Sequence, residues 1–260
     1  MNLYSKDSLK QALREICNSG WIENGRQGNV GGVGNTLEDL LGIEENNLPI
    51  PNASEWELKC QRAETTSLTT LFHVEPSPRA LRFVPKVFLP GYGWPHELAG
   101  IRYPANEMSF RQTIHGLRRS DRGFMVVVDR SLRRVTISFD SGAIDAKHDK
   151  WMETVRERVG LGELNPQPYW GFDDLFHKAG TKLLNCFYVI AESKKEAGIE
   201  YFKYTRILQL QQFSLDKFLN ALEIGDVLVD FDARTGHNHG TKFRLRQDKL
   251  PTLYGQVEVI

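Results

Sequence analysis

Apolar residues recur at helical spacing near the start of the chain. Over residues 8–19 they fall three and four positions apart, which predicts an amphipathic helix with one apolar face. Ser8 and Gln11 form a candidate capping box at its start, and Gly20 is a natural end. The residues of the apolar face are Leu9, Ala12, Leu13, Ile16 and Cys17.

A second, shorter helix is predicted over residues 34–42. Asn35 or Thr36 can cap its start, and Gly42 can end it. Its apolar stripe is formed by Leu37, Leu40 and Leu41. Residues 22–36, before most of this helix, are rich in glycine and asparagine and are expected to form a loop.

Strands and further helices follow with no internal repeat. Residues 75–107 are rich in proline, glycine and aromatic residues, and we expect a long ordered connection there because the aromatic side chains require burial. The mixture of elements predicts an α/β or α+β fold. Strands are predicted at residues 47–50, 55–62, 69–74, 185–192, 201–208, 227–231 and 242–246, a hairpin at 123–129 and 134–140, and helices at 173–184 and 214–222.

Size and composition are those of an ordinary soluble globular protein. The chain has 260 residues, of which 40% are hydrophobic and 25% charged, so it can bury a substantial core. No apolar stretch is long enough to span a bilayer, and the N-terminus has no signal-peptide core. Three widely spaced cysteines without a CxxC pair suit a reducing cytoplasm and give no zinc motif.

The charge is balanced overall but uneven along the chain. Its 33 basic and 33 acidic residues argue mildly against a protein that coats DNA non-specifically. Seven arginines nevertheless lie between positions 111 and 134. Any one of them is best explained as part of a solvated hairpin face, whereas as a group they resemble phosphate contacts. They are Arg111, Arg118, Arg119, Arg122, Arg130, Arg133 and Arg134.

Glu57 and Lys59 are the candidate catalytic pair. They lie two residues apart in a predicted strand, so their side chains point to the same face. A carboxylate can hold a hard divalent cation, and a neighbouring ammonium can orient a water molecule or offset phosphate charge. Such a pair is common on solvated strands, but Glu38, in the preceding helix, adds a second acidic group at the sheet edge.

These residues resemble the PD-(D/E)xK nucleases, and more narrowly the MvaI/BcnI family of restriction endonucleases, with the MvaI side the better match. The resemblance implies a mixed sheet flanked by helices plus a DNA-recognition lobe. It predicts a catalytic lobe of residues 1–95 with about 174–195, and a recognition lobe of 96–173 and 196–260. The matching segments are residues 31–43, 45–47, 57–59, 67–73, 111–119, 190–194, 201–204, 225–226 and 237–244.

The resemblance also implies the roles of the catalytic residues. Glu57 and the Leu58 carbonyl would hold Mg²⁺, with Ca²⁺ as a non-catalytic substitute, Lys59 would position water, and Glu38 would assist from outside the metal shell. The family's metal-binding aspartate is replaced here by Asn52.

An amide at position 52 carries no charge and would hold the metal loosely. Three explanations fit: a change introduced to trap an uncut complex, a naturally weakened site, or replacement by Glu55. We lean towards the first, because the rest of the site is intact.

The resemblance places base readout in the C-terminal part of the chain. Arg244 would face the major groove, where arginine suits bidentate bonding to guanine. His73 and Lys242 stand at positions where the BcnI branch has histidines, and Asp232 stands where MvaI-like members carry an arginine. The identity of the central base pair in the DNA site therefore stays undetermined. The candidate DNA-binding residues are Arg111, Arg118, Arg119, His73, His237, His239, Lys242 and Arg244.

Three functions are compatible with this sequence. The first is a Mg²⁺-dependent type II restriction endonuclease that cuts double-stranded DNA at a short CC-x-GG-type site, as a monomer that nicks the strands in turn. A cognate methyltransferase would belong to the same system without forming a complex. The second is a sequence-specific DNA-binding protein that has lost cleavage through Asn52. The third is a MutH-like strand nickase.

Overall fold

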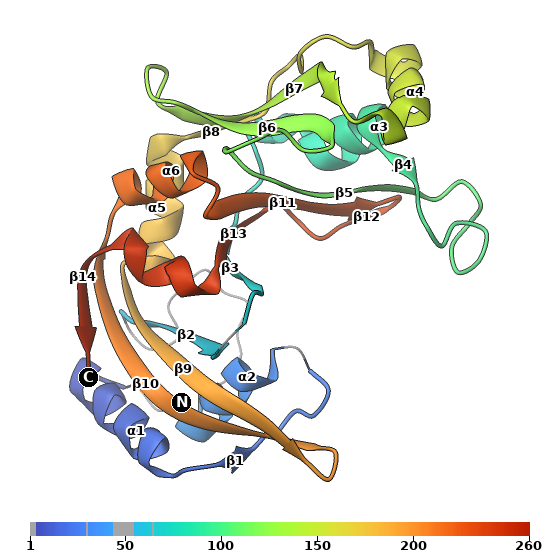
Figure 1. The fold of residues 1–260 in the computed structure, drawn as a ribbon. Coiled ribbons are helices and arrows are strands. Elements are labelled where there is room, and N and C mark those ends of the chain that lie inside the picture. Colours follow the sequence, from blue (N-terminus) through green and yellow to red (C-terminus); the bar gives the residue numbers. More distant parts are fainter. Residues whose placement is uncertain (1–3, 30, 44–54, 64) are drawn as a thin grey trace. The chain divides into compact units, whose positions relative to one another are not determined.

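A computed structural model describes residues 4–29, 31–43, 55–63 and 65–260 (Figure 1). The chain divides into two compact units. Unit 1 comprises residues 1–67, 177–214 and 247–260, and unit 2 comprises residues 68–176 and 215–246. The boundaries differ from the predicted lobes: residues 68–95 belong to unit 2, and residues 196–214 and 247–260 belong to unit 1. Strand pairing explains the difference, because the strand after residue 67 pairs within unit 2 and the C-terminal strand pairs within unit 1.

Unit 1 is built on a five-stranded mixed sheet. The strand order is β1 (Ile22–Glu23), β10 (Ile199–Phe213), β9 (Asn185–Glu196) and β2 (Glu57–Arg62), and β14 (Tyr254–Val259) also pairs with β10. β9 and β10 form a long antiparallel hairpin that bends across the unit (Figure 1). β2 runs parallel to β9, with Glu57 opposite Cys186 and Lys59 opposite Tyr188.

Two helices cover one face of this sheet. α1 (Lys6–Asn18) and α2 (Gly32–Leu41) bury Leu9, Leu13 and Leu37 against Leu58 of β2 and Phe187 of β9. This apolar cluster fixes the position of β2, since alternate β2 side chains face away from it.

The helices themselves are as predicted, but their details differ. α1 has its capping box at Ser5 and Ser8, not at Ser8 and Gln11. α2 begins at Gly32 after Gly31, with no side-chain cap, and ends at Gly42 in a left-handed conformation with φ of 63°. Leu40 is 45% exposed, so the predicted stripe of α2 consists of Leu37 and Leu41 without it.

The opposite face of the unit 1 sheet is covered by the C-terminal segment. η4 (Gln247–Leu253) buries Leu250 and Leu253, and the backbone carbonyl of Gln247 accepts a hydrogen bond of 2.6 Å from the Tyr188 hydroxyl. Helix α5 (Phe172–Leu183) leads into β9 and belongs to unit 1 from His177 onwards.

Unit 2 is built on a six-stranded antiparallel sheet. Its strands follow the order β3 (Leu68–His73), β13 (Lys242–Arg246), β11 (Val227–Arg234), β5 (Met108–Ile114) and β4 (Trp94–Pro95), with β12 (His237–Asn238) paired to β11. One face is an aromatic core in which Phe88 stacks on Phe110 with ring centroids 4.9 Å apart, and Phe72 stacks on Phe243 at 5.1 Å.

A three-stranded sheet and several helices complete unit 2. The predicted hairpin is confirmed as β6 (Arg122–Asp129) and β7 (Arg134–Ile144), to which β8 (Tyr169–Gly171) adds. α6 (Leu215–Glu223) is also confirmed, whereas α4 (Asp149–Val159), β5 and β14 were not predicted. The 3-10 helix η3 (Ala146–His148) precedes α4.

The long connection is ordered, as expected. It contains the 3-10 turn η1 (Arg79–Leu81), the π-helix η2 (Val84–Phe88) and the short α3 (Leu89–Tyr92), and it buries Phe83, Phe88 and Tyr92. The predicted strand at residues 47–50 lies outside the described residues. No helix of the described chain is long and apolar enough to cross a membrane.

Candidate active site and nucleic-acid interface

β2 presents Glu57 and Lys59 on one face of the unit 1 sheet. Leu58, between them, points into the apolar cluster under α1 and α2, so the two charged side chains emerge on the opposite face. Lys59 Nζ lies 2.8 Å from Glu57 Oε1. The sequence prediction that these side chains share a face is therefore confirmed by the distance between them.

Glu57 is an unusually buried carboxylate. It is 2% exposed, and a charge removed from water to this extent needs close compensation. Two ammonium groups provide it, because Lys182 Nζ of α5 lies 3.7 Å from the same oxygen, Oε1. Lys182 was not predicted from the sequence, since a lysine in a helix far along the chain carries no motif that links it to β2.

The charge of Lys59 is secured by its neighbours. Burial lowers the pKa of Lys59. The charge of Glu57 and its hydrogen bond raise this pKa, the charges of Cys186 and Glu38 raise it more weakly, and together these effects outweigh burial. The net result is a pKa above the ordinary 10.5. Lys59 is therefore an ammonium, a hydrogen-bond donor, at neutral pH.

Glu38 lies in α2, which contacts β2 at the edge of the sheet. Its charge raises the pKa of Lys59, as the weakest of the causes that act on that lysine. The place of Glu38 in the catalytic site stays a prediction.

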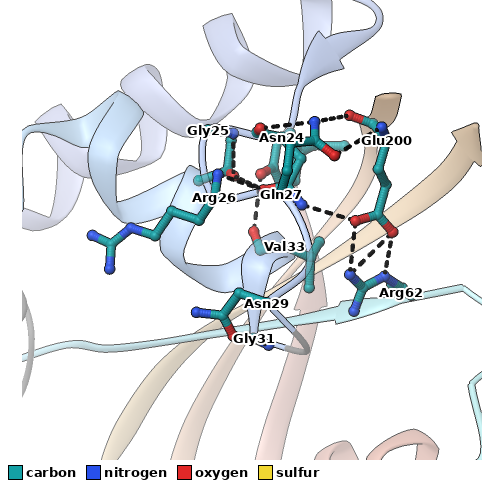
Figure 2. Close-up of polar contacts among 11 residues, drawn as sticks. Asn24, Gly25, Arg26, Gln27, Asn29, Gly31, Val33, Arg62 and Glu200 are labelled. Atoms are coloured by element: carbon teal, nitrogen blue, oxygen red, sulfur yellow. Dashed lines mark hydrogen bonds and ion pairs between the residues drawn. The ribbon is translucent and has the colours of Figure 1, made fainter. Parts of the chain in front are cut away.

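A polar network holds the loop before α2 in place (Figure 2). The Glu200 carboxylate accepts hydrogen bonds from Asn24 Nδ2 at 2.8 Å and from Arg62 at 3.2–3.3 Å. The backbone of Glu200 bonds to Asn24 and to the Gln27 side chain. Because Arg62 belongs to β2 and Asn24 precedes α2, this network fixes the helix of Glu38 relative to the strand of Glu57.

Glu57 Oε2 is the atom that best fits a bound cation. It is buried, and among the described residues it has no hydrogen-bond partner. The rest of the predicted metal set is less complete. Asn52 lies outside the described residues, Glu55 is exposed, and within the described chain no cluster of three or more histidine, cysteine, aspartate or glutamate side chains is positioned to hold a metal. The donor chemistry of Glu57 nevertheless suits one anionic ligand of a divalent cation.

A polar face on the unit 2 sheet gathers several of the predicted DNA-binding residues. Side chains from strands β3, β13, β11 and β5 contribute to it, and these line a pocket of about 520 Å³. We call this surface the polar sheet face. Its lining residues are Thr70, Arg111, Gln112, Thr113, Asp230, Asp232, Lys242 and Arg244.

Acidic and basic side chains alternate across the polar sheet face. Arg244 Nη1 lies 3.4 Å from Asp230 Oδ2, and Arg244 Nη2 donates to the Leu68 carbonyl at 3.0 Å. Asp232 Oδ1 lies 3.4 Å from Arg111 Nε, and its Oδ2 lies 3.7 Å from Lys242 Nζ. Arg244 thus has its guanidinium held by two partners, an arrangement that suits a side chain that reads a base edge.

The predicted histidines lie near this face but make different contacts. His73, at the end of β3, is exposed and lies opposite Lys242 in the strand pairing. The two positions at which the BcnI branch has histidines are therefore neighbours. His237 and His239 are exposed and contact each other edge to face, with ring centroids 4.2 Å apart. Glu75 anchors the following turn by accepting hydrogen bonds from the amide and hydroxyl of Thr241.

The arginine-rich segment 111–134 is largely neutralised within unit 2. Six of its seven arginines, all except Arg118, lie within 4 Å of an acidic side chain. Arg119 also donates to the Gly123 carbonyl, and Arg122 packs 4.0 Å from the ring centroid of Trp94. The segment therefore does not form one basic surface. Arg111 and Arg118 are exposed and stay candidates for phosphate contact.

The mixed sheet with its buried Glu57–Lys59 pair, together with the polar sheet face, matches the architecture of a restriction endonuclease. Residues 10–254 match the model of the MvaI/BcnI restriction endonuclease family. The chain therefore belongs to this family. A sequence search of curated proteins found no match.

Two solved structures are similar over nearly the whole chain. One is the complex of restriction endonuclease MvaI with cognate DNA substrate, with 28% identity, coverage of 98% of this chain and 99% of that chain, and a TM-score of 0.75. The other is MvaI in the absence of DNA, with 28% identity, full coverage of both chains and a TM-score of 0.57. These matches support a sequence-specific DNA endonuclease.

Proposed function

We propose that this protein is a divalent-metal-dependent type II restriction endonuclease that cuts double-stranded DNA at a short CC-x-GG-type site. The observation that carries the proposal is the buried Glu57 carboxylate, with two ammonium groups on Oε1 and its Oε2 unpaired among the described residues, within a chain matched to this family from residue 10 to residue 254. One active site per chain favours a monomer that nicks the two strands in turn.

Glu57, the Leu58 carbonyl and, weakly, Asn52 would hold the cation. When bound, Mg²⁺ supplies Lewis-acid stabilisation of the phosphate and lowers the pKa of a bound water. Lys59 donates hydrogen bonds to the attacking water, and its charge offsets the charge that develops on the phosphate. Glu38 adds negative charge near Lys59 and helps to keep it protonated.

The polar sheet face is our proposed base-reading surface. Arg244 has its guanidinium oriented by Asp230 and the Leu68 carbonyl, which leaves further N–H groups for a guanine edge. Asp232, held between Arg111 and Lys242, is an acceptor suited to a cytosine amino group. His73, His237 and His239, with Arg118 and Arg119, complete the proposed contacts.

Digestion of a plasmid that carries CC-x-GG sites tests the proposal. The parent chain, with Asn52, and Asn52→Asp are incubated with Mg²⁺ and, in parallel, with Ca²⁺. We expect nicked and then linear DNA with Mg²⁺, stronger with Asn52→Asp, and binding without cutting with Ca²⁺. Failure of both chains to cut any duplex would contradict the proposal.

A cleavage-deficient DNA-binding protein is the second candidate, favoured by the uncharged Asn52. It predicts tight, metal-independent binding to a specific duplex and no cutting even after Asn52→Asp. A MutH-like nickase is a third candidate, and comparison of unmodified, hemimethylated and fully methylated duplexes separates it from the first.

A further inference from the structure

Lys182 is the side chain at the active centre that the proposed chemistry leaves without a role. It is the penultimate residue of α5, just before the chain enters β9, and its side chain is 30% exposed. Its Nζ lies 3.7 Å from Glu57 Oε1, the oxygen that also accepts the hydrogen bond from Lys59 Nζ at 2.8 Å. Two ammonium groups therefore share one oxygen of a single carboxylate.

This arrangement has an electrostatic consequence. Glu57 balances one of the two ammonium groups, and Glu38 acts on Lys59 only weakly, so the second ammonium leaves net positive charge beside an atom that is suited to a cation. Placing that excess charge at a proposed metal site costs cation affinity, and simple neutralisation of Glu57 does not require it. The second ammonium group beside Glu57 therefore needs a functional explanation.

The two lysines differ in how tightly they are bound. Lys59 makes a hydrogen bond, whereas Lys182, at 3.7 Å, is an ion-pair partner just beyond hydrogen-bond distance. A movement of less than about 1 Å would bring Lys182 to the distance that Lys59 now has. If Lys59 turns towards a reacting water, Lys182 can replace it on Oε1.

We propose that Lys182 is a positioning residue that takes over Glu57 Oε1 and so releases Lys59 to act on the water and phosphate. The proposal rests on the proposed nuclease function. Without Lys182, Lys59 would remain the only ammonium on Oε1, and withdrawing it would leave this buried oxygen without a partner. Lys182 thus lowers the free-energy cost of using Lys59 in the reaction.

The test compares Lys182→Met, which removes the charge, with Lys182→Arg, which keeps it. Lys195→Met is the control, because Lys195 is an exposed lysine of β9 in the same unit. All three changes are made in the parent chain and in Asn52→Asp. Calorimetric titration with Ca²⁺ in the absence of DNA reports the cation site directly, independently of cleavage.

We expect Lys182→Met to bind Ca²⁺ roughly three- to tenfold more tightly, since one repulsive charge is gone. In Mg²⁺, its single-turnover cleavage should be at least about tenfold slower, with DNA affinity measured in Ca²⁺ unchanged. Lys182→Arg should stay near the parent in both measurements, and Lys195→Met should match it.

Tighter cation binding with slower cleavage is a combination that loss of stability does not produce. Unchanged Ca²⁺ affinity in Lys182→Met, weaker DNA binding in proportion to slower cleavage, or no Ca²⁺ binding in either parent would overturn the role of Lys182. Absence of cleavage by both parents would contradict the nuclease function instead, while the Ca²⁺ titration still decides whether Lys182 lies in the cation field.

Discussion

Arg244 and Asp230 form an ion pair across neighbouring strands of the polar sheet face, with Nη1 and Oδ2 3.4 Å apart. Asp230 is 8% exposed and also accepts a hydrogen bond of 2.8 Å from the Thr113 hydroxyl. Thr113 of β5 thus holds the Asp230 carboxylate in place, and Asp230 in turn orients the guanidinium of Arg244 on β13. The pair is a pre-oriented donor array at the surface rather than a flexible arginine.

Arg244→Ala should weaken specific DNA binding by about 1–3 kcal/mol if the side chain reads a guanine. Binding to random duplex should change little, because backbone contacts carry that term. Competition binding with a cognate and a scrambled duplex measures both. Arg118→Ala is the control, as an exposed arginine expected to affect the two duplexes alike. An equal loss on both duplexes for Arg244→Ala would identify it as a backbone contact.

Lys59→Ala should abolish cleavage while DNA binding is largely retained. Removing one ammonium affects the water and the transition-state charge, whereas many other contacts hold the duplex. Cleavage is measured under single turnover, and binding by titration in Ca²⁺. If binding and cleavage fall together, Lys59 is instead an anchoring or structural residue.

The Glu57–Lys59 pair sets an expectation for how the free energy of unfolding depends on pH. The folded pKa of Lys59 lies above 10.5, so its stabilising contribution is complete below that pH and is lost only as pH rises through the higher folded value. Urea unfolding of the parent and Lys59→Met should therefore differ by a constant amount from pH 6 to about 9. A difference that changes within this window would show that the folded pKa is not raised.

Glu200→Ala should destabilise unit 1 by roughly 1–3 kcal/mol. The substitution removes the acceptor of Arg62 and Asn24 and leaves a half-buried guanidinium without its carboxylate (Figure 2). Denaturant unfolding measures the loss. Glu196→Ala is the matched control in the same hairpin, since that carboxylate is exposed and its pair with Lys194 is solvated. Similar small losses for both variants would contradict an organising role for Glu200.

His115 gives a second pH-dependent expectation, in unit 2. Burial, followed by the charges of Arg118 and Arg246, lowers the pKa of His115 below 6.5. The unfolded chain therefore takes up the proton more readily, and stability falls as pH drops below 6.5. Unfolding midpoints of the parent and His115→Gln at pH 7.5 and 5.5 should show a smaller pH dependence in the variant. An equal dependence would assign the effect to other groups.

Local spacing predicted the parts of the site that depend on local geometry. Glu57 and Lys59 share a face because a strand alternates every two residues, and Gly42 ends α2 because a left-handed residue is needed there. Lys182 could not be found in this way, since its approach to Glu57 depends on how α5 packs before β9.

The prediction for the arginine-rich segment also failed because contacts between distant segments cannot be read from local spacing. Sequence proximity suggested one basic surface, but the acidic partners of Arg130 and Arg133 come from distant segments, at Glu223 and Asp173. α4 was missed for a related reason. Its pattern is mainly charged, and only Trp151 and Val155 are buried, so too few apolar positions mark its inner face.

Asn52→Asp should raise Mg²⁺-dependent cleavage. The exchange is nearly isosteric, so packing and DNA contacts should hardly change, while position 52, which the resemblance assigns to the same cation as Glu57, gains a negative charge. Mg²⁺ favours anionic oxygen ligands, so less of it should be needed for the half-maximal rate.

The comparison is a Mg²⁺ titration of single-turnover cleavage for both chains, with Asn52→Ala as the control that lacks any side-chain oxygen. The expected order of rates at fixed Mg²⁺ is Asp, then Asn, then Ala. Glu55→Gln, made in the parent chain, tests the exposed neighbouring carboxylate as a substitute ligand. If the parent chain cuts as fast as the aspartate variant across the titration and Glu55→Gln abolishes that activity, the ligand has moved to Glu55 and position 52 is not the weakened one.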